Sequence, residues 1–172
     1  METPFNYKIE PIVLLDYDKK AGCGCTHRGE LLYLGEELPS SMEQWRKWYK
    51  ALPDIVEQIL VVYTLDCISI NLDTVQILDK PLMECVSRLD GYPVSLEWTE
   101  HMELAVNLPE IMEAGKALDA VRDKHGFQII LDDVFSGEDT FRRQCAVTPD
   151  MVKVDAEVFQ MTRTNPRIFD LR

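Results

Sequence analysis

The chain has 172 residues, of which 46% are hydrophobic and 28% are charged, and this balance is typical of one globular domain rather than of a disordered or fibrous chain. Its formal net charge of −12 disfavours binding to nucleic acid polymers, because an acidic surface repels phosphate backbones. The sequence contains no apolar run of about 18 residues and no signal-peptide pattern, and its five Cys residues are scattered, so we expect a cytoplasmic protein without membrane contact.

Hydrophobic periodicity and turn residues predict alternating strands and helices. Ser40 and Glu43 form a capping-box pattern at a helix start, Pro53 should interrupt that helix, and Gly126 stands where a helix commonly ends. In chain order, the predicted elements are strands at 7–15 and 29–34, helices at 40–52 and 54–63, a strand at 66–72, a helix at 78–89, a strand at 93–98, a helix at 109–125, and strands at 127–131 and 151–154.

Six strands that alternate with helices predict an α/β fold with a parallel sheet covered by helices. A closed eight-stranded barrel takes about 250 residues, so a chain of 172 residues forms either an open sheet or an incomplete barrel. The sequence shows no repeat, low-complexity tract or linker, and we therefore treat residues 1–172 as a single domain.

Polar side chains with oxygen ligands lie at or near the predicted strand ends. Since the carboxyl ends of parallel strands meet on one face, these side chains should converge there. Oxygen ligands favour hard cations such as Mg²⁺ or Mn²⁺ over zinc, and Lys153 on the next strand could supply a positive charge. Taken singly, each of these residues is more often a solvated or helix-capping residue than a metal ligand, whereas the set as a whole points to a shared site. The set consists of Glu30, Asn71, Glu97, Asp132 and Asp133.

Short motifs fall on these elements in a fixed order: IEPIV at 9–13, ELL at 30–32, NLD at 71–73, EWTE at 97–100, DDVFSG at 132–137 and PDMVKVD at 149–155. They resemble the motifs YQPIV, EAL, NLS, ELTE, DDFGTG and PVDxxKID of the EAL-domain family, over residues 7–160. The resemblance implies a TIM-barrel-like EAL fold that is incomplete, with about six parallel strands and flanking helices, and so a single truncated EAL-like domain over residues 1–172.

The same resemblance implies a metal-dependent phosphodiesterase that hydrolyses cyclic di-GMP to the linear dinucleotide pGpG. Two divalent ions, Mg²⁺ or Mn²⁺, would clamp the phosphate and lower the pKa of a bound water. Carried over by position, Glu30, Asn71, Glu97 and Asp132 would ligate the first ion and Asp133 the second. Lys153 would orient or deprotonate the attacking water, so that Lys153 and Glu30 are the expected catalytic residues.

The chain also departs from the family pattern. Leu34 replaces the arginine that follows the EAL motif, Glu10 replaces the glutamine of YQPIV, and Val134-Phe135 replaces Phe-Gly in the aspartate turn. The late glutamate and glutamine motifs of the family have no counterpart. A non-catalytic descendant that binds cyclic di-GMP or a protein partner and acts as a regulator is therefore the alternative. The open strand edges predict a homo-oligomer or a partner protein that completes the barrel.

Three local features have competing readings. Cys23, Cys25 and His27 could ligate zinc, although they lack the fourth ligand that makes such a site specific. A base-stacking platform could form from the aromatic residues at helical spacing, but a core or interface role is more common. His101 could be a proton shuttle or a solvated side chain. The aromatic residues are Trp45, Trp48 and Tyr49.

Overall fold

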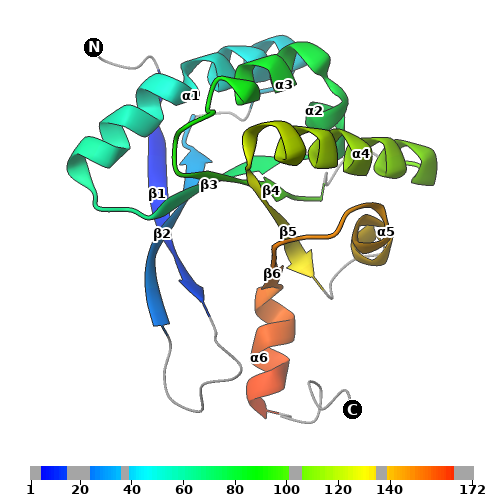
Figure 1. Cartoon of the computed structure of the whole chain (residues 1–172). Helices are drawn as coiled ribbons and strands as arrows, with labels where there is room; N and C mark the ends of the chain where they lie inside the picture. Colours follow the sequence, from blue (N-terminus) through cyan, green and yellow to red (C-terminus); the bar gives the residue numbers. More distant parts are fainter. Residues whose placement is uncertain (1–4, 15–23, 36–38, 101–105, 135–138, 165–172) are drawn as a thin grey trace.

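The computed structural model describes residues 5–14, 24–35, 39–100, 106–134 and 139–164. Its strands form one six-stranded sheet in sequence order, and the predicted number of strands is confirmed. The strands are β1 (Tyr7–Leu14), β2 (Gly24–Tyr33), β3 (Cys67–Leu72), β4 (Val94–Trp98), β5 (Gln128–Val134) and β6 (Met151–Val154). The predicted fold class, an incomplete TIM-barrel-like α/β sheet with flanking helices, is confirmed (Figure 1).

One strand differs from the predicted all-parallel sheet. β1 pairs with β2 antiparallel, with Tyr7 opposite Tyr33 and Glu10 opposite Glu30, whereas each later neighbour pair from β2 to β6 is parallel. The reason is the short connection between Leu14 and Gly24. A parallel pair needs a crossover of about a dozen residues or more, usually with a helix, and too few residues are available here.

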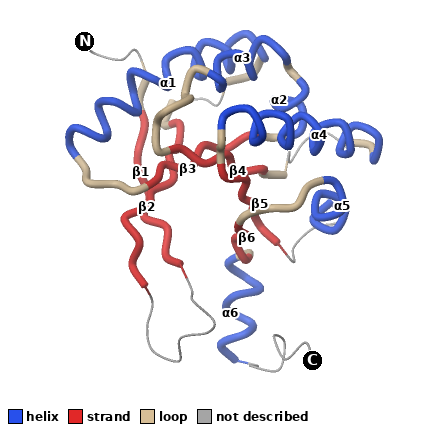
Figure 2. Tube along the Cα trace, viewed as in Figure 1, coloured by secondary structure: helices blue, strands red, loops and turns tan. Residues whose placement is uncertain are grey.

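The helices of the described ranges are α1 (Met42–Val62), α2 (Thr74–Leu78), α3 (Lys80–Ser87), α4 (Leu108–His125), α5 (Asp139–Ala146) and α6 (Ala156–Thr164). Figure 2 shows α1, α3 and α4 along one side of the curved sheet, while α6 runs on from the end of β6. None of the helices in the described ranges is both long and apolar enough to cross a membrane. The sequence patterns gave no sign of α5 and α6, because both helices carry many polar residues.

The core lies between this helical layer and the convex face of the sheet. Alternate residues of the central strands are buried apolar side chains, such as Ile68 and Ile70 in β3 and Leu96 in β4. The residues between them face the opposite, concave side and are polar, as Ser69 and Glu97 illustrate. Because side chains alternate between the two faces of a strand, the apolar residues anchor the sheet while the polar residues remain available for chemistry.

The predicted break at Pro53 is wrong, since α1 runs without interruption through this residue. Proline removes one backbone hydrogen bond and clashes with the preceding turn, at a cost of about 3 kcal/mol. The buried side chains of Tyr49, Leu52 and Val56 offset this cost by packing α1 into the core. The cap of the helix also lies one residue later than predicted, because Ser41 rather than Ser40 accepts the hydrogen bond from the Gln44 amide, at 3.4 Å.

Asp79 stands between α2 and α3, so that the predicted helix at 78–89 begins only at Lys80. Its carboxylate accepts a hydrogen bond from the Leu82 amide at 2.9 Å and so caps the start of α3. The same carboxylate receives two hydrogen bonds from Arg46 of α1, at 2.9 and 2.5 Å. The predicted helix at 109–125 is confirmed as α4, and Gly126 ends it with the left-handed φ of 74°.

Candidate functional site

Side chains from three strands contact Lys153 on the concave face, and a fourth strand adds Asn71 beside them. The Lys153 ammonium lies 2.8 Å from Oε2 of Glu30 in β2 and 3.1 Å from Oδ1 of Asp132 in β5, and it also contacts Oε1 of Glu97 in β4. Asn71 of β3 pairs in register with Glu97, and its amide donates to Glu30 Oε1 at 2.8 Å. We call Glu30, Asn71, Glu97, Asp132 and Lys153 the Lys153 cluster.

The cluster contains buried oxygen atoms that lack a protein partner. Glu97 is fully buried. Its Oε2 and the Oδ1 of Asn71 have no hydrogen-bond partner among the described residues. An unpartnered buried polar atom is unfavourable by about 1–3 kcal/mol. These two oxygens, together with the carboxylates of Glu30 and Asp132, are suited to a bound cation.

Burial and charge act on the two central groups of the cluster. Burial raises the pKa of Glu97 to about 8, with Asp132 and Glu30 adding to the shift and Lys153 opposing it. Burial lowers the pKa of Lys153, but the carboxylates around it outweigh this effect, so that its pKa lies above the ordinary value. One ammonium cannot neutralise three carboxylates. The cluster therefore takes up a proton, or a further cation, near neutral pH.

Asp133 follows Asp132 in an irregular part of β5, where the pairing with β6 shifts register. It is exposed, and its φ of 51° is the single positive value of a non-glycine residue in the described ranges. Desolvation raises the pKa of its carboxyl, and so do Asp132 and Asp155. Its predicted role as a ligand of the second ion stays a prediction.

Arg143 of α5 is a buried residue that the sequence analysis missed. Its side chain is 2% exposed. It donates to the carbonyl oxygen of Trp98 at 2.5 Å and to that of Asp132 at 3.1 Å, and it also pairs with Glu100 at 3.2 Å. No sequence signal distinguishes it from the adjacent Arg142, which is exposed.

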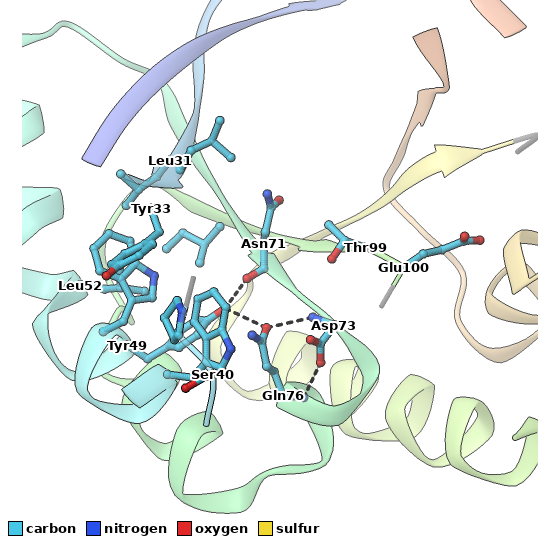
Figure 3. Close-up of a pocket in the computed structure, with 15 residues that line it drawn as sticks. Leu31, Tyr33, Ser40, Tyr49, Leu52, Asn71, Asp73, Gln76, Thr99 and Glu100 are labelled. Atoms are coloured by element: carbon cyan, nitrogen blue, oxygen red, sulfur yellow. Dashed lines mark hydrogen bonds between the residues drawn. The ribbon is translucent and has the colours of Figure 1, made fainter. Parts of the chain in front are cut away.

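A pocket of about 750 Å³ opens beside the cluster at the carboxyl ends of β2, β3 and β4. In Figure 3, Tyr33, Tyr49 and Leu52 lie on one side of Asn71, and Thr99 and Glu100 lie on the other. The Tyr49 hydroxyl donates to the Asn71 carbonyl oxygen, which joins the pocket to the cluster.

The aromatic residues near this pocket are mainly structural. Trp48 and Tyr49 are buried core residues, which is the more common role of aromatic residues at helical spacing. Trp45 is partly buried against them, with its ring centroid 6.3 Å from that of Tyr33. The aromatic edge of the pocket is thus formed by Tyr33 and Trp45 together with this core.

The zinc site at Cys23, Cys25 and His27 and the proton shuttle at His101 remain predictions. Cys23 and His101 lie outside the described residues, as does the side chain of Cys25. His27 is exposed, and its Nδ1 lies 4.0 Å from Oδ2 of Asp66. In the described part of the chain, no group of three or more His, Cys, Asp or Glu side chains is arranged to hold a metal ion. Lys153 lies among the carboxylates of the cluster instead.

The donor chemistry of the cluster nevertheless suits a divalent ion. Its donors are carboxylate and amide oxygens, the ligands that Mg²⁺ and Mn²⁺ prefer. Asn71 Oδ1 and Glu97 Oε2 need no rearrangement of a protein hydrogen bond to accept an ion, because neither has a partner in the described ranges. The residues present therefore fit a hard cation.

Comparison with known proteins gives a likeness in structure but not in sequence. No family model matches the sequence, and no curated protein matches it. A standalone versatile EAL protein from Vibrio cholerae O395, in its c-di-GMP-bound form, matches with a TM-score of 0.62 and 16% identity, covering 96% of this chain and 73% of that one.

Two further structures give the same result. The FimX EAL domain of Xanthomonas citri, in complex with c-diGMP, matches with a TM-score of 0.53 and 14% identity, over 77% of this chain and 59% of that one. The EAL enzyme Bd1971, in its cAMP-bound form, matches with a TM-score of 0.57 and 17% identity, over 94% and 49%. The chain thus spans about half to three quarters of these proteins and has an EAL-like fold with six of the strands of a barrel.

Proposed function

We propose that this chain binds cyclic di-GMP at the Lys153 cluster and hydrolyses one of its phosphodiester bonds with the help of Mg²⁺ or Mn²⁺. The observation that carries the proposal is the convergence of Glu30, Glu97 and Asp132 on Lys153. The structurally similar proteins from Xanthomonas citri and Vibrio cholerae both have c-di-GMP bound, which supports this choice of ligand.

Within this proposal, the cation-holding residues are those with suitable oxygens. Glu30, Asn71, Glu97 and Asp132 would hold the first ion, and Asp133 would help to hold the second. Bound divalent ions supply charge neutralisation at the phosphate and a more acidic water. Neutralisation matters here because the chain has a formal net charge of −12 and would otherwise repel an anionic dinucleotide.

The role of Lys153 follows from its surroundings. Because the neighbouring carboxylates keep its pKa high, Lys153 acts as a cation that orients water or phosphate rather than as a base. Hydrolysis adds the water oxygen to phosphorus and breaks the bond from phosphorus to the 3′ oxygen. The proton lost by water passes through a carboxylate of the cluster, such as Glu30, to the leaving 3′ oxygen. The product is the linear dinucleotide pGpG.

The neighbouring pocket offers space for one base of the ligand. Its aromatic edge at Tyr33 and Trp45 can stack with a purine, an interaction that is worth about 1–3 kcal/mol per base. Glu100 and Thr99 at the other side supply hydrogen-bonding groups. The pocket and the cluster meet at Asn71, so a nucleotide could occupy both at once.

A second candidate is a non-catalytic protein that binds cyclic di-GMP, or a protein partner, and acts as a regulator. Leu34 favours it, because this residue stands where the EAL family has an arginine and is 44% exposed. An exposed leucine offers no charge to a phosphate. Loss of that contact can weaken positioning for catalysis while the rest of the site still binds ligand.

Calorimetry with cyclic di-GMP, in the presence and absence of Mn²⁺, coupled to product analysis by chromatography, separates the two candidates. The first predicts ion-dependent binding and the appearance of pGpG. Asp132→Asn should lose both, whereas Asp123→Asn, an exposed acid of α4, should behave like wild type. Binding without product over several hours supports the regulator and rules out the enzyme. If cyclic di-GMP does not bind with or without Mn²⁺, both the enzyme and the regulator that binds this nucleotide are refuted.

A further inference from the structure

The buried side chain of Arg143 connects the two strands β4 and β5, which carry Glu97 and Asp132 of the Lys153 cluster. One terminal nitrogen of its guanidinium donates to the carbonyl oxygen of Trp98, directly after Glu97. The other donates to the carbonyl oxygen of Asp132, a member of the cluster. A single planar group therefore joins the end of β4, one residue after Glu97, to β5 at Asp132.

These bonds lie where the strand pairing stops. The recorded pairs between β4 and β5 end at Trp98 with Leu131, and Asp132 follows immediately. Beyond this point the spacing of the strands is no longer set by their own hydrogen bonds. The rigid fork of a guanidinium binds two acceptors in a fixed geometry, so Arg143 continues the connection for one more residue.

The position of α5 is itself constrained. A Cβ atom on Gly115 of α4 would lie 2.3 Å from the carbonyl oxygen of Ala146, so the two helices approach each other at a distance that only glycine permits. Arg122 of α4 donates to the carbonyl oxygen of Thr148, just beyond α5, at 2.7 Å. The packing of α5 against α4 therefore fixes the position of Arg143 relative to β4 and β5.

We propose that Arg143 is a positioning residue that sets the separation of Glu97 and Asp132 and thereby the affinity of the Lys153 cluster for a divalent cation. The inference rests on the proposed function in one respect, namely that the cluster binds such a cation. The inference adds that Arg143, which would not contact the ion, determines the affinity for the ion through the backbone of β4 and β5.

The test is the affinity for Mn²⁺, measured by electron paramagnetic resonance of the free ion with the full chain. Arg143→Lys keeps the positive charge but cannot bridge both carbonyl groups, so we expect its Mn²⁺ affinity to fall by at least about tenfold, as is usual when a residue that supports metal ligands is replaced. Arg142→Lys, the same change at the exposed neighbouring position, should bind Mn²⁺ as wild type does.

A general loss of stability has to be distinguished from positioning. Leu118→Ala removes a buried side chain of α4 and should lower the melting temperature without changing Mn²⁺ affinity at a temperature where the protein is folded. If Arg143→Lys binds Mn²⁺ like wild type, or if Leu118→Ala loses as much affinity as Arg143→Lys, the positioning role is refuted. If wild type binds no Mn²⁺ at all, the proposed metal-dependent function fails first, and the inference fails with it.

If Arg143→Lys does not fold, nuclear magnetic resonance of the wild-type protein tests the positioning role of Arg143 instead. The guanidinium protons of Arg143 should give slowly exchanging nitrogen-15 resonances that shift when Mg²⁺ is added, because the strand ends that they join also hold the ion. Resonances that exchange rapidly, or that do not move while Mg²⁺ binding is detected by calorimetry, overturn the proposal.

Discussion

The ammonium of Lys153 lies 2.8 Å from Oε2 of Glu30, although 123 residues separate the two in the sequence. The two residues come from β6 and β2, which are not neighbours in the sheet. Arg28 of β2 likewise reaches Met151 of β6, with Nη1 3.4 Å from the sulfur. These two contacts show that the sheet curves enough for side chains of β2 and β6 to meet across its concave face, and this curvature brings the acids together.

Divalent ions should stabilise the protein. The carboxylates of the Lys153 cluster repel one another in the metal-free state, and an ion that binds only the folded state raises its stability by mass action. At an Mn²⁺ concentration about 100 times the dissociation constant, we expect the melting temperature to rise by roughly 5–10 °C. Asp132→Asn should lose most of this rise in differential scanning calorimetry. Equal shifts in both proteins would show that Asp132 does not help to bind the ion.

Replacement of Lys153 should separate catalysis from metal binding. Lys153→Met removes the cation to which three carboxylates are bound, so we expect the metal-free protein to lose about 3 kcal/mol of unfolding free energy near neutral pH. Mn²⁺ should still bind and restore part of this loss, while formation of pGpG should cease. Urea unfolding with EDTA or with Mn²⁺, and a product assay, measure these effects. Retained turnover would exclude a role of Lys153 in the reaction.

Glu97 should make the metal-free protein less stable as pH rises. The pKa of its carboxyl is about 8 in the folded state, against 4.5 as the ordinary value, so the folded state binds more protons between these limits. Its contribution is fully present below about pH 4.5 and is lost as pH rises through about 8, with a slope of up to about 1.4 kcal/mol per pH unit.

The check is urea unfolding in EDTA at several pH values within this window, with Glu97→Gln as the comparison. The variant cannot lose a proton at this position, so its stability should change less with pH than that of wild type. If wild type and Glu97→Gln have the same pH dependence, another group is responsible. Added Mn²⁺ should oppose the wild-type trend, since a metal ligand must be deprotonated.

Asp79 should stabilise the fold through its two separate contacts. Asp79→Ala removes the cap of α3 and the partner of Arg46, and we expect a loss of about 1–2 kcal/mol. The ion pair contributes little of this, because Arg46 is 41% exposed. Asp79→Asn keeps a capping acceptor and should lose less.

The same residue gives an expectation in acid. The Arg46 hydrogen bond holds the pKa of Asp79 below its ordinary value. Its contribution is therefore present above that ordinary value and is lost as pH falls through the lowered pKa. Chemical unfolding of wild type and both variants at neutral and acid pH measures this. Equal losses for Asp79→Ala and Asp79→Asn would show that the cap is not the main contribution.

Self-association remains our prediction for the free strand edges. β1 and β6 stand at the two edges of the sheet, and near β6 the side chains of Val152, Phe159 and Met161 are 48%, 37% and 57% exposed. Burial of apolar area is favourable by about 25 cal/mol per Å², so we expect a homodimer or larger assembly in light scattering. Val152→Lys should weaken the assembly. A monomer of 19.8 kDa at micromolar concentration contradicts the prediction.

Local patterns in the sequence were sufficient for the elements whose signals are local. Residues 151–154 and α4 with its terminal Gly126 were predicted within one residue, because β-branched runs, proline at a helix start and glycine at a helix end act through neighbouring backbone atoms. The convergence of Glu30, Asn71, Glu97 and Asp132 was also accessible from sequence. Once the strands are parallel, their carboxyl ends must share one face.

Other features depended on contacts between distant segments. Pro53 lies within a continuous helix because buried neighbours in the tertiary structure offset its local cost. The charge of Lys153 was undecided in the sequence, since burial and nearby acids shift its pKa in opposite directions; the three carboxylates that surround it decide that it stays protonated. Arg143 had no local signal at all. Its burial and its bonds to two strand ends arise from the packing of α5 against α4, which only the folded chain defines.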